Sequence, residues 1–444
     1  MGRRTRTPNT ALAALMREAD WGNDQVARAV RRTGAEAGLA LTYDKTSVSH
    51  WLAGSRPRAE VAGVVREAFT RRLGRPVAAE ETGLGGGPGP AADPVAGLVA
   101  LGRSDMDPSR RSVLAAGLYS AALAVPGFGE AADRIDRTAA GRTVRIGDGE
   151  VATVRTMTDR LAGILDELGA AHARPMMASF LVNSVGPWLQ AAGTARARSG
   201  MLAAAADLTY LAGWSAVYEL AQGLGQSYYV QALRLADQAG DHATYCRTLR
   251  GMSLQASSLG HGPRALEYAD SAAQAAPAAG PRLTAFLRGQ QAHGAAMVKD
   301  RRQAFARLSE TESALSRADG RNDAVGGYDR AAYQFHVSHV LYELGDLPGS
   351  IRALESSNRV RPPAERQGRV HGLGLLARRQ MEHGHVEAAA ATWSSFLDDY
   401  AGISSVRGDE HFTALRAGVR PHLGNRAVAR LDQRARDVGR LKAA

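Results

Sequence analysis

The second half of the chain repeats one pattern of side-chain sizes, and this repetition restricts the possible folds more than any other feature. Four turn positions start the pattern: Gly260, Lys299, Gly345 and Gly384. They are 39, 46 and 39 residues apart. At the fifth, ninth and twelfth residues after each turn position stand mostly small or apolar residues: Ala265, Ala269, Ala272; Ala304, Leu308, Thr311; Ser350, Leu354, Ser357; Ala389, Trp393, Phe396. An internal repeat in the range of about 20 to 50 residues indicates stacked units rather than one closed core.

This order of residues resembles the second helix of the tetratricopeptide repeat, which has a turn glycine, a small residue, a bulky residue, a small residue and a terminating proline. Pro277 and Pro362 stand where that proline is expected. The usual repeat of about 34 residues is exceeded here, so we expect lengthened helices or loops. Residues 229–233 resemble the second helix of an earlier unit. We therefore predict an all-α protein whose residues 151–444 form a tetratricopeptide-like helical-repeat solenoid.

A short amphipathic helix is predicted between Tyr43 and Pro57. Asp44 has the side chain of an N-cap, and Gly54 stands where a left-handed residue ends a helix. The apolar residues fall on one side at helical spacing: Val48, Trp51 and Leu52. Small polar and cationic residues remain on the other side. A helix that buries one narrow stripe and exposes such residues suits the major groove of DNA.

Helices are also predicted on both sides of this segment, so that residues 9–73 form a small four-helix unit. The order Val-Ser-x-Trp-x-x-Gly resembles the recognition helix of Xre-type helix-turn-helix regulators. One departure is the connection from Thr33 to Thr42, which is longer than the usual turn of about three or four residues. The resemblance implies that Lys45, Thr46 and His50 face base edges. It also implies four positions near phosphates: Asn23, Ser47, Ser49 and Arg56.

The distribution of charge agrees with a nucleic-acid partner. Residues 1–75 contain 14 Lys and Arg against 7 Asp and Glu, a net charge of +7, while the whole chain has +11. Positive charge concentrated on one small unit is expected where phosphates are neutralised. Residues 2–6 would add a basic arm to this surface. The alternative is that the excess charge only maintains solubility.

Residues 83–150 are predicted to link a helix-turn-helix domain, residues 1–82, to the repeat domain. The stretch 83–90 is rich in glycine and proline, which favours a flexible tether. It lacks the Gly-Lys-Ser/Thr of a phosphate-binding loop. The apolar residues 112–126 follow an arginine pair, as in an export signal, but they lie far from the N-terminus and are too few to span a bilayer. We expect them to form a buried helix or to dock on the repeat domain.

No motif for catalysis or cofactor binding is present, and we expect neither an enzyme nor a bound cofactor. The single cysteine, Cys246, excludes an intramolecular disulfide and favours a cytoplasmic location. His336 and His339 lie three residues apart, and His383 and His385 flank a glycine. Neither pair has an evident third ligand, so no metal site is predicted.

In tetratricopeptide repeats the outward residues of each first helix line a concave groove. Counting back from the turn positions gives a candidate set that is cationic and aromatic: Arg247, Arg250, His293, Phe335, His339, Tyr342, His371 and Arg378. Such a set would hold a peptide carboxylate or an acidic side chain. The alternatives are that several of these residues are ordinary solvated residues or pack between repeats, or that the array serves only for dimerisation.

The complete order, a helix-turn-helix followed by helical repeats, resembles peptide-responsive bacterial regulators and tetratricopeptide-containing regulators of filamentous high-GC bacteria. It implies a homodimeric, sequence-specific transcriptional regulator that binds double-stranded DNA and senses a peptide or protein on its repeats. The other possibility is a repeat scaffold whose helix-turn-helix does not read DNA.

Overall fold

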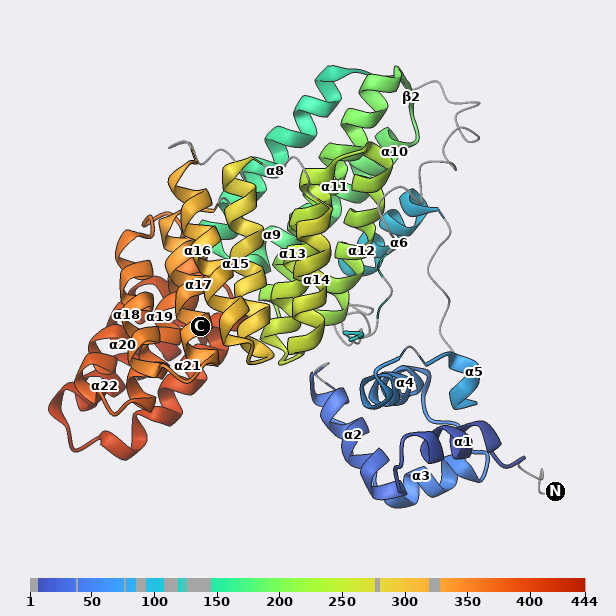
Figure 1. Cartoon of the computed structure of the whole chain (residues 1–444), viewed down its shortest axis with the longest axis horizontal. Coiled ribbons are helices and arrows are strands. Elements are labelled where there is room, and N and C mark those ends of the chain that lie inside the picture. Colours follow the sequence, from blue (N-terminus) through green and yellow to red (C-terminus); the bar gives the residue numbers. More distant parts are fainter. Residues whose placement is uncertain are drawn as a thin grey trace.

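The structure is a computed structural model of the whole chain. It describes residues 7–36, 39–75, 77–84, 93–107, 119–121, 123, 125, 145–275, 280–318 and 328–443. Figure 1 shows a small N-terminal helical unit beside a larger helical body. Apart from one pair of two-residue strands, the regular structure in these ranges is helical. The predicted all-α fold is confirmed.

The N-terminal unit contains five helices around a small apolar core. They are α1 (Thr10–Glu18), α2 (Asn23–Glu36), α3 (Lys45–Leu52), α4 (Ala59–Leu73) and α5 (Ala79–Thr82). The core includes Leu12, Val30, Trp51 and Phe69, each at most 3% exposed. Asn9 caps α1 by accepting a hydrogen bond from the Leu12 amide, and its own amide group donates to the Thr82 carbonyl. This second bond fastens the end of the unit to its beginning.

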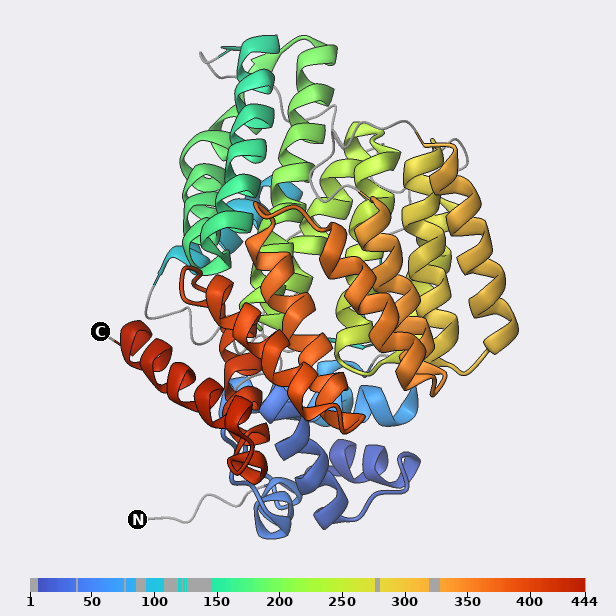
Figure 2. The same cartoon turned by 90° about the vertical axis from the view of Figure 1, so that its left-hand side faces the viewer.

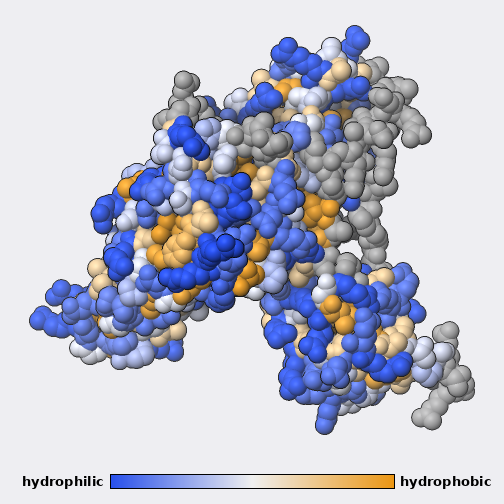
Figure 3. All heavy atoms as spheres, viewed as in Figure 1, coloured by the Kyte–Doolittle hydropathy of each residue, from blue (hydrophilic) through white to orange (hydrophobic). Residues whose placement is uncertain are grey.

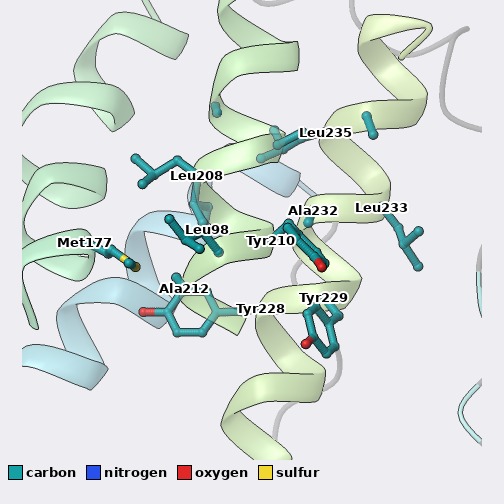
Figure 4. Packing of buried hydrophobic residues seen from close by; sticks show 14 of the residues in the cluster. Leu98, Met177, Leu208, Tyr210, Ala212, Tyr228, Tyr229, Ala232, Leu233 and Leu235 are labelled. Atoms are coloured by element: carbon teal, nitrogen blue, oxygen red, sulfur yellow. The ribbon is translucent and has the colours of Figure 1, made fainter. Parts of the chain in front are cut away.

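A first group of elements in the large body precedes the regular helix pairs. It consists of α6 (Pro94–Met106), β1 (Arg145–Ile146), α8 (Asp148–Leu168), α9 (Ala170–Phe180), the π-helix η2 (Leu181–Val185), α10 (Gly186–Leu189) and β2 (Ala192–Gly193). The two strands pair in parallel. Helix α6 inserts Leu98 into the core beside Met177 and Tyr228 (Figure 4). The buried Asp105 of the same helix accepts a hydrogen bond from the Tyr228 hydroxyl at 2.9 Å and pairs with Arg174. The sequence analysis did not anticipate this helix.

The repeat array consists of antiparallel helix pairs. Six first helices are followed by six second helices: α11 (Ala195–Tyr218) with α12 (Gln222–Ala239), α13 (His242–Ser258) with α14 (Gly262–Gln274), α15 (Pro281–Met297) with α16 (Arg301–Ser316), α17 (Arg330–Glu343) with α18 (Leu347–Val360), α19 (Arg366–Glu382) with α20 (Val386–Tyr400), and α21 (Val406–Gly418) with α22 (Arg426–Ala443). A short 3₁₀ helix, η3 (Arg420–His422), lies within the last pair. Each of the first five pairs packs along most of its length.

The turns within the pairs explain the sequence repeat. The backbone is left-handed at Gly260, Lys299, Gly345 and Gly384, with φ between 65° and 86°. All twelve residues at the fifth, ninth and twelfth positions after these turns are buried, none more than 6% exposed. The predicted register of the second helices is therefore confirmed. A further turn of this kind, between α11 and α12, places Leu220 at φ 58°. The sequence pattern missed it because a leucine rarely occupies that conformation.

The array curves until α21, the first helix of the last pair, reaches the elements at the start of the array. In Figure 2 the helices follow an arc from green through yellow to red. The Ser404 amide donates to the Leu168 carbonyl at 2.9 Å, and the guanidinium of Arg407 on α21 lies 5.4 Å from the ring centre of Tyr218 on α11. Helix α19 also packs against α8. The first helices of the pairs therefore surround an interior instead of lining an open groove.

The two units form separate lobes of the molecular surface, and hydrophilic residues cover most of the visible face of the N-terminal lobe (Figure 3). Within the described ranges, every helix is too short or too polar to cross a membrane. Several sequence predictions fall outside those ranges, namely the basic arm 2–6, most of 83–90, Pro277 and most of 112–126.

Candidate functional site

Helix α3 is closed at both ends by local contacts. The Asp44 carboxylate accepts hydrogen bonds from the Ser47 amide and hydroxyl, each at 2.9 Å. The same hydroxyl accepts a bond of 3.3 Å from the Asp44 amide. The bonds from Ser47 lower the pKa of Asp44, and the retained negative charge stabilises the N-terminus of the helix. Gly54 has a φ of 95° and lets the chain leave the helix.

The two faces of α3 differ as the sequence predicts. Val48 is fully buried and Trp51 is 3% exposed, with the tryptophan ring 5.2 Å from that of Tyr43. The opposite face carries four exposed residues, Lys45, Thr46, Ser49 and His50. Helix α3 therefore presents a polar surface on a rigid apolar support.

The remaining candidate DNA contacts lie around this face. The Asn23 side chain, at the start of α2, donates a hydrogen bond of 2.8 Å to the Ser49 hydroxyl. Arg56 is exposed in the turn that follows α3. Ser47 is half-buried, and its hydroxyl is used in the N-terminal cap. The structure thus brings six of the seven residues to one surface with free or locally bonded side chains, while Ser47 has mainly a capping role.

The long connection between α2 and α3 divides into two parts. Helix α2 continues to Glu36, and residues 39–44 are non-helical up to the N-cap. The Leu39 amide donates to the Gly34 carbonyl at 2.9 Å, which terminates α2. Arg31 donates to the Tyr43 carbonyl at 2.6 Å. These bonds hold the connection against α2, so the inserted residues set the angle at which α3 is presented.

The candidate groove residues all lie on the first helices of the pairs, six of them along the interior and two, Tyr342 and Arg378, at exposed positions. Arg247 pairs with Asp207 and lies over the Tyr210 ring at 5.0 Å. Arg250 is buried between Trp214 and Phe286. Sequence analysis treated the two arginines alike, but the structure gives only Arg247 a carboxylate partner among the described residues.

Farther along the interior, histidines and an aromatic ring form a row of contacts from helix to helix. The rings of His293 and His339 are 4.8 Å apart, and Phe335 lies 4.6 Å from His339 and 5.8 Å from His371. His371 continues the row to His411, with ring nitrogens 3.0 Å apart. Burial is the largest cause that lowers the pKa of each histidine, to about 4 for His293 and about 3 for His411. These four histidines are therefore uncharged at neutral pH.

Tyr342 and Arg378, the last two candidates, line a cavity of about 420 Å³ formed by α17, α19, α20 and α21. The Tyr342 hydroxyl donates to Glu382 at 3.1 Å, and Arg379 lies over its ring at 4.2 Å. Arg379, rather than the predicted Arg378, is the buried arginine here; burial lowers its pKa to about 10. Its guanidinium donates to the hydroxyls of Ser338 and Ser350.

Sequence analysis missed several residues of the interior: Tyr210, Trp214, Tyr218, Phe286, Arg379, Arg407 and His411. A usable signal existed for one of them. His293, His339 and Arg378 stand six residues before their turn positions, and Trp214 stands six before Leu220. Recognising Leu220 as a turn position would have extended the row to α11.

A short strip of chain, residues 119–121, connects the two units. Its repeat side is held by Gln226 of α12, whose amide group accepts from the Ser120 amide at 2.7 Å and donates to the Ser120 carbonyl at 2.8 Å. The Tyr119 ring stacks on His261 with centres 5.4 Å apart. Arg264 of α14 donates to the Ala121 carbonyl. The described part of the apolar segment 112–126 therefore docks on the repeat body, and residues 119–120 of it are not helical.

The opposite side of this strip is held by α4 of the N-terminal unit. The Glu67 carboxylate, 5% exposed as a residue, accepts from the Ala121 amide at 2.8 Å. Arg71 donates to the Tyr119 carbonyl at 3.3 Å and pairs with Glu67 and Glu36. Among the described helices, no helix of the N-terminal unit packs extensively on a repeat helix. Residues 119–121, the clasp, are therefore the main described connection between the units.

The structure places the histidine pairs considered as metal ligands as follows. His336 hydrogen-bonds to the Tyr328 hydroxyl at 2.8 Å, and the rings of His383 and His385 have centres 4.4 Å apart and are tilted by 44°. Within the part of the chain that the structure describes, no three His, Cys, Asp or Glu side chains are grouped to bind a metal. Cys246 is buried, and burial raises its pKa to about 12, which leaves the thiol protonated.

Comparison with known proteins gives a match to one family model and distant likenesses to solved structures. Residues 12–85 match the family model of the SP15 N-terminal domain, which covers the N-terminal unit and less than half of the chain. No curated protein matches the chain. Among solved structures, the crystal structure of a Rap protein complexed with competence and sporulation factor is similar with 12% sequence identity and a TM-score of 0.41. That match covers 67% of this chain and 89% of the Rap chain.

Proposed function

We propose that this protein is a sequence-specific DNA-binding transcriptional regulator. In this proposal α3 enters the major groove, Lys45, Thr46 and His50 read base edges, and Arg56 contacts the phosphate backbone. The observation that carries the proposal is the pair of faces on α3, one buried around Val48 and Trp51 and one exposed and polar. The net charge of +7 on residues 1–75 supports it. The function requires no catalytic group.

The test is selection of bound duplexes from a random pool by the full-length protein, followed by measurement of affinity against salt concentration. A regulator selects a defined consensus, and its affinity falls as salt rises because bound counterions are released. Failure to enrich any sequence would contradict DNA reading. The N-terminal unit would then be a protein-binding module, and the chain a repeat scaffold.

The repeat body is proposed to regulate this unit by binding a peptide, protein or other ligand. The clasp offers a physical route, since Gln226 and Arg264 of the repeats and Glu67 and Arg71 of α4 hold the same three residues. A ligand acts through this route only by the difference between its affinities for the clasped and released states.

We further propose that the protein acts as a homodimer, because one small unit offers few base contacts and two half-sites about 34 Å apart would supply more. Sedimentation of the free protein and of its complex with the selected duplex tests this. Monomer alone in both samples would contradict it.

A further inference from the structure

Arg250 is a buried cation to which no described side chain supplies an anion. The residue is only 8% exposed, and its Nε atom is buried without a hydrogen-bond partner. A guanidinium stays protonated in proteins, so it cannot reduce the cost of burial by losing its proton. A buried charge is normally paired, because removal from water without compensation is strongly unfavourable. No described residue matches this charge, which points to a bound partner.

Two aromatic rings hold the guanidinium in place. Its central carbon lies 4.1 Å from the ring centre of Phe286 and 5.5 Å from that of Trp214. These contacts stabilise the cation through the faces of the rings but do not use its N–H groups. No described residue accepts a hydrogen bond from the in-plane donors, which can therefore bind an acceptor with two oxygens side by side.

Two more polar atoms near Arg250 are buried without a hydrogen-bond partner among the described residues. They are the hydroxyl of Tyr229, a residue with no exposed surface, and Nδ1 of His293, which is 4% exposed. The charge of Arg250 acts on both groups: with burial and Arg379 it lowers the pKa of His293, and it opposes the burial that raises the pKa of Tyr229. Tyr229 of α12, Arg250 of α13 and His293 of α15 thus bring polar groups without partners among the described residues to one region of the interior.

We propose that Arg250 is a binding site for the carboxylate of a ligand whose neighbouring group is flat and apolar. The guanidinium of Arg250 can pair with the single negative charge of a carboxylate, while the phenol of Tyr229 and the imidazole of His293 beside it are neutral. The rings of Trp214 and Phe286 provide apolar walls for the adjoining group. The inference deepens the proposed regulatory function by naming the ligand chemistry, and rests on that function for its effect on DNA binding.

Such a carboxylate has two possible sources, a small aromatic acid or the C-terminus of a peptide. We would use benzoate with benzamide as its uncharged control, and acetyl-Ala-Ala-Phe with its C-terminal amide as control. Binding to the full-length protein is measured without DNA, by tryptophan fluorescence and by the melting temperature. Both carboxylates, or one of them, should bind at millimolar concentration or below, and the amides at least about tenfold more weakly. Binding of benzoate alone identifies a small-acid site, and tighter binding of the tripeptide identifies a peptide terminus.

Three variants locate the binding. Arg250→Gln should weaken carboxylate binding by at least about tenfold, and Arg250→Lys should weaken it less, because lysine keeps the charge but lacks the planar fork. Arg302→Gln removes a charge from an exposed position of α16 and should change nothing. Equal binding by wild type and Arg250→Gln, equal binding of acid and amide, or no binding of either carboxylate to wild type would each overturn the proposal.

Loss of structure in Arg250→Gln, seen as lost helical circular dichroism, would make that variant uninformative about contacts. Trp214→Phe then provides the decision, because it keeps Arg250 and its other ring contact. Its fluorescence should no longer respond to benzoate; a response equal to that of wild type places the carboxylate elsewhere and overturns the proposal. Since no DNA is present, failure here leaves DNA reading by α3 standing, and a failed duplex selection leaves the carboxylate site standing.

Discussion

Replacement of Gln226 by leucine should release the clasp while leaving both units folded. Gln226 is 4% exposed, and its side-chain amide forms both hydrogen bonds that hold the Ser120 backbone to the repeat body, at 2.7 and 2.8 Å. Leucine has a similar length and a high helix propensity, so α12 should persist. The change removes a donor and an acceptor at once and puts nothing polar in their place.

The expected size of the effect follows from these two bonds. Each contributes about 1 kcal/mol net, so their loss favours the released state by about 2 kcal/mol, a factor of about 30 in the equilibrium. Ser120 is only half-buried, and water can replace part of the lost bonding, so this figure is close to an upper bound. The bonds from Glu67 and Arg71 to the other side of the strip are unchanged.

Hydrogen exchange of the Ser120 and Ala121 amides measures this opening. In the clasp the Ala121 amide donates to the buried Glu67 carboxylate, so its exchange requires the strip to separate from α4. Exchange at Ser120, whose amide loses its acceptor directly, should accelerate up to about 30-fold, and exchange at Ala121 should accelerate less. The control is Ser227→Ala on the same helix, whose hydroxyl bonds only to Gly223 within α12.

Unchanged exchange at Ser120 in Gln226→Leu, with helical content preserved, would refute the reasoning, because the glutamine would then not hold the strip. A second readout concerns regulation: if the clasp couples the units, a ligand that shifts operator affinity in wild type should shift it less in the variant. Full ligand response together with an open clasp would show that coupling uses another route, such as dimer geometry.

Three further predictions concern the reading helix, its support and the buried histidines. Lys45→Ala should relax one position of the selected consensus at a cost of about 1–3 kcal/mol, whereas Arg56→Ala should weaken binding to all duplexes and reduce the salt slope, as measured by competition with variant duplexes. Trp51→Ala should cost about 3–5 kcal/mol and abolish DNA binding while the repeats remain folded, seen as two separate melting transitions. The pKa of His293 is lowered to about 4, so the unfolded chain binds the proton more readily. Acidification from about pH 6.5 to pH 4 should therefore destabilise the repeats, with about 3 kcal/mol of the loss due to His293, and urea titrations should show a smaller loss in His293→Gln than in wild type.

The parts of the fold that the sequence predicts well are those in which local chemistry and burial agree. Asp44, Val48 and Gly54 lie within eleven residues, and each has the cap, core or turn role that its type favours. The second helices of the repeats were predicted in register for the same reason, since close helix packing admits only small residues at fixed offsets. Leu220 and Lys299 show the limit of this reasoning. Both adopt the left-handed turn that glycine favours, and only the helices on either side impose it.

The properties of the candidate site depend on contacts between residues that are distant in sequence, and the sequence did not predict those contacts. Arg247 and Arg250 lie on the same helix three residues apart, yet Asp207 of α11, the first helix of the preceding pair, pairs with Arg247 alone. The clasp presents the same difficulty, because Ser120 and Gln226 are 106 residues apart and their bonds use the backbone of the strip. Any residue type can form a backbone hydrogen bond. The composition of residues 112–126 therefore indicated that the segment docks, but not which residues hold it.

Closure of the array explains why the interior differs from the open groove that the sequence suggested. An open concave surface would leave His293, His371 and Arg250 in water, where histidines keep ordinary pKa values and an unpaired arginine is unremarkable. Here the turn at Ser404 packs on the end of α8, and Arg407 reaches the Tyr218 ring across the gap between the last and first pairs. The rotation from pair to pair depends on helix lengths and on the irregular spacing of the turns, and it accumulates over the whole array. Side chains that would be solvated in an open groove are thus removed from water. Because Arg250 is buried, its guanidinium charge is stabilised by binding an anion.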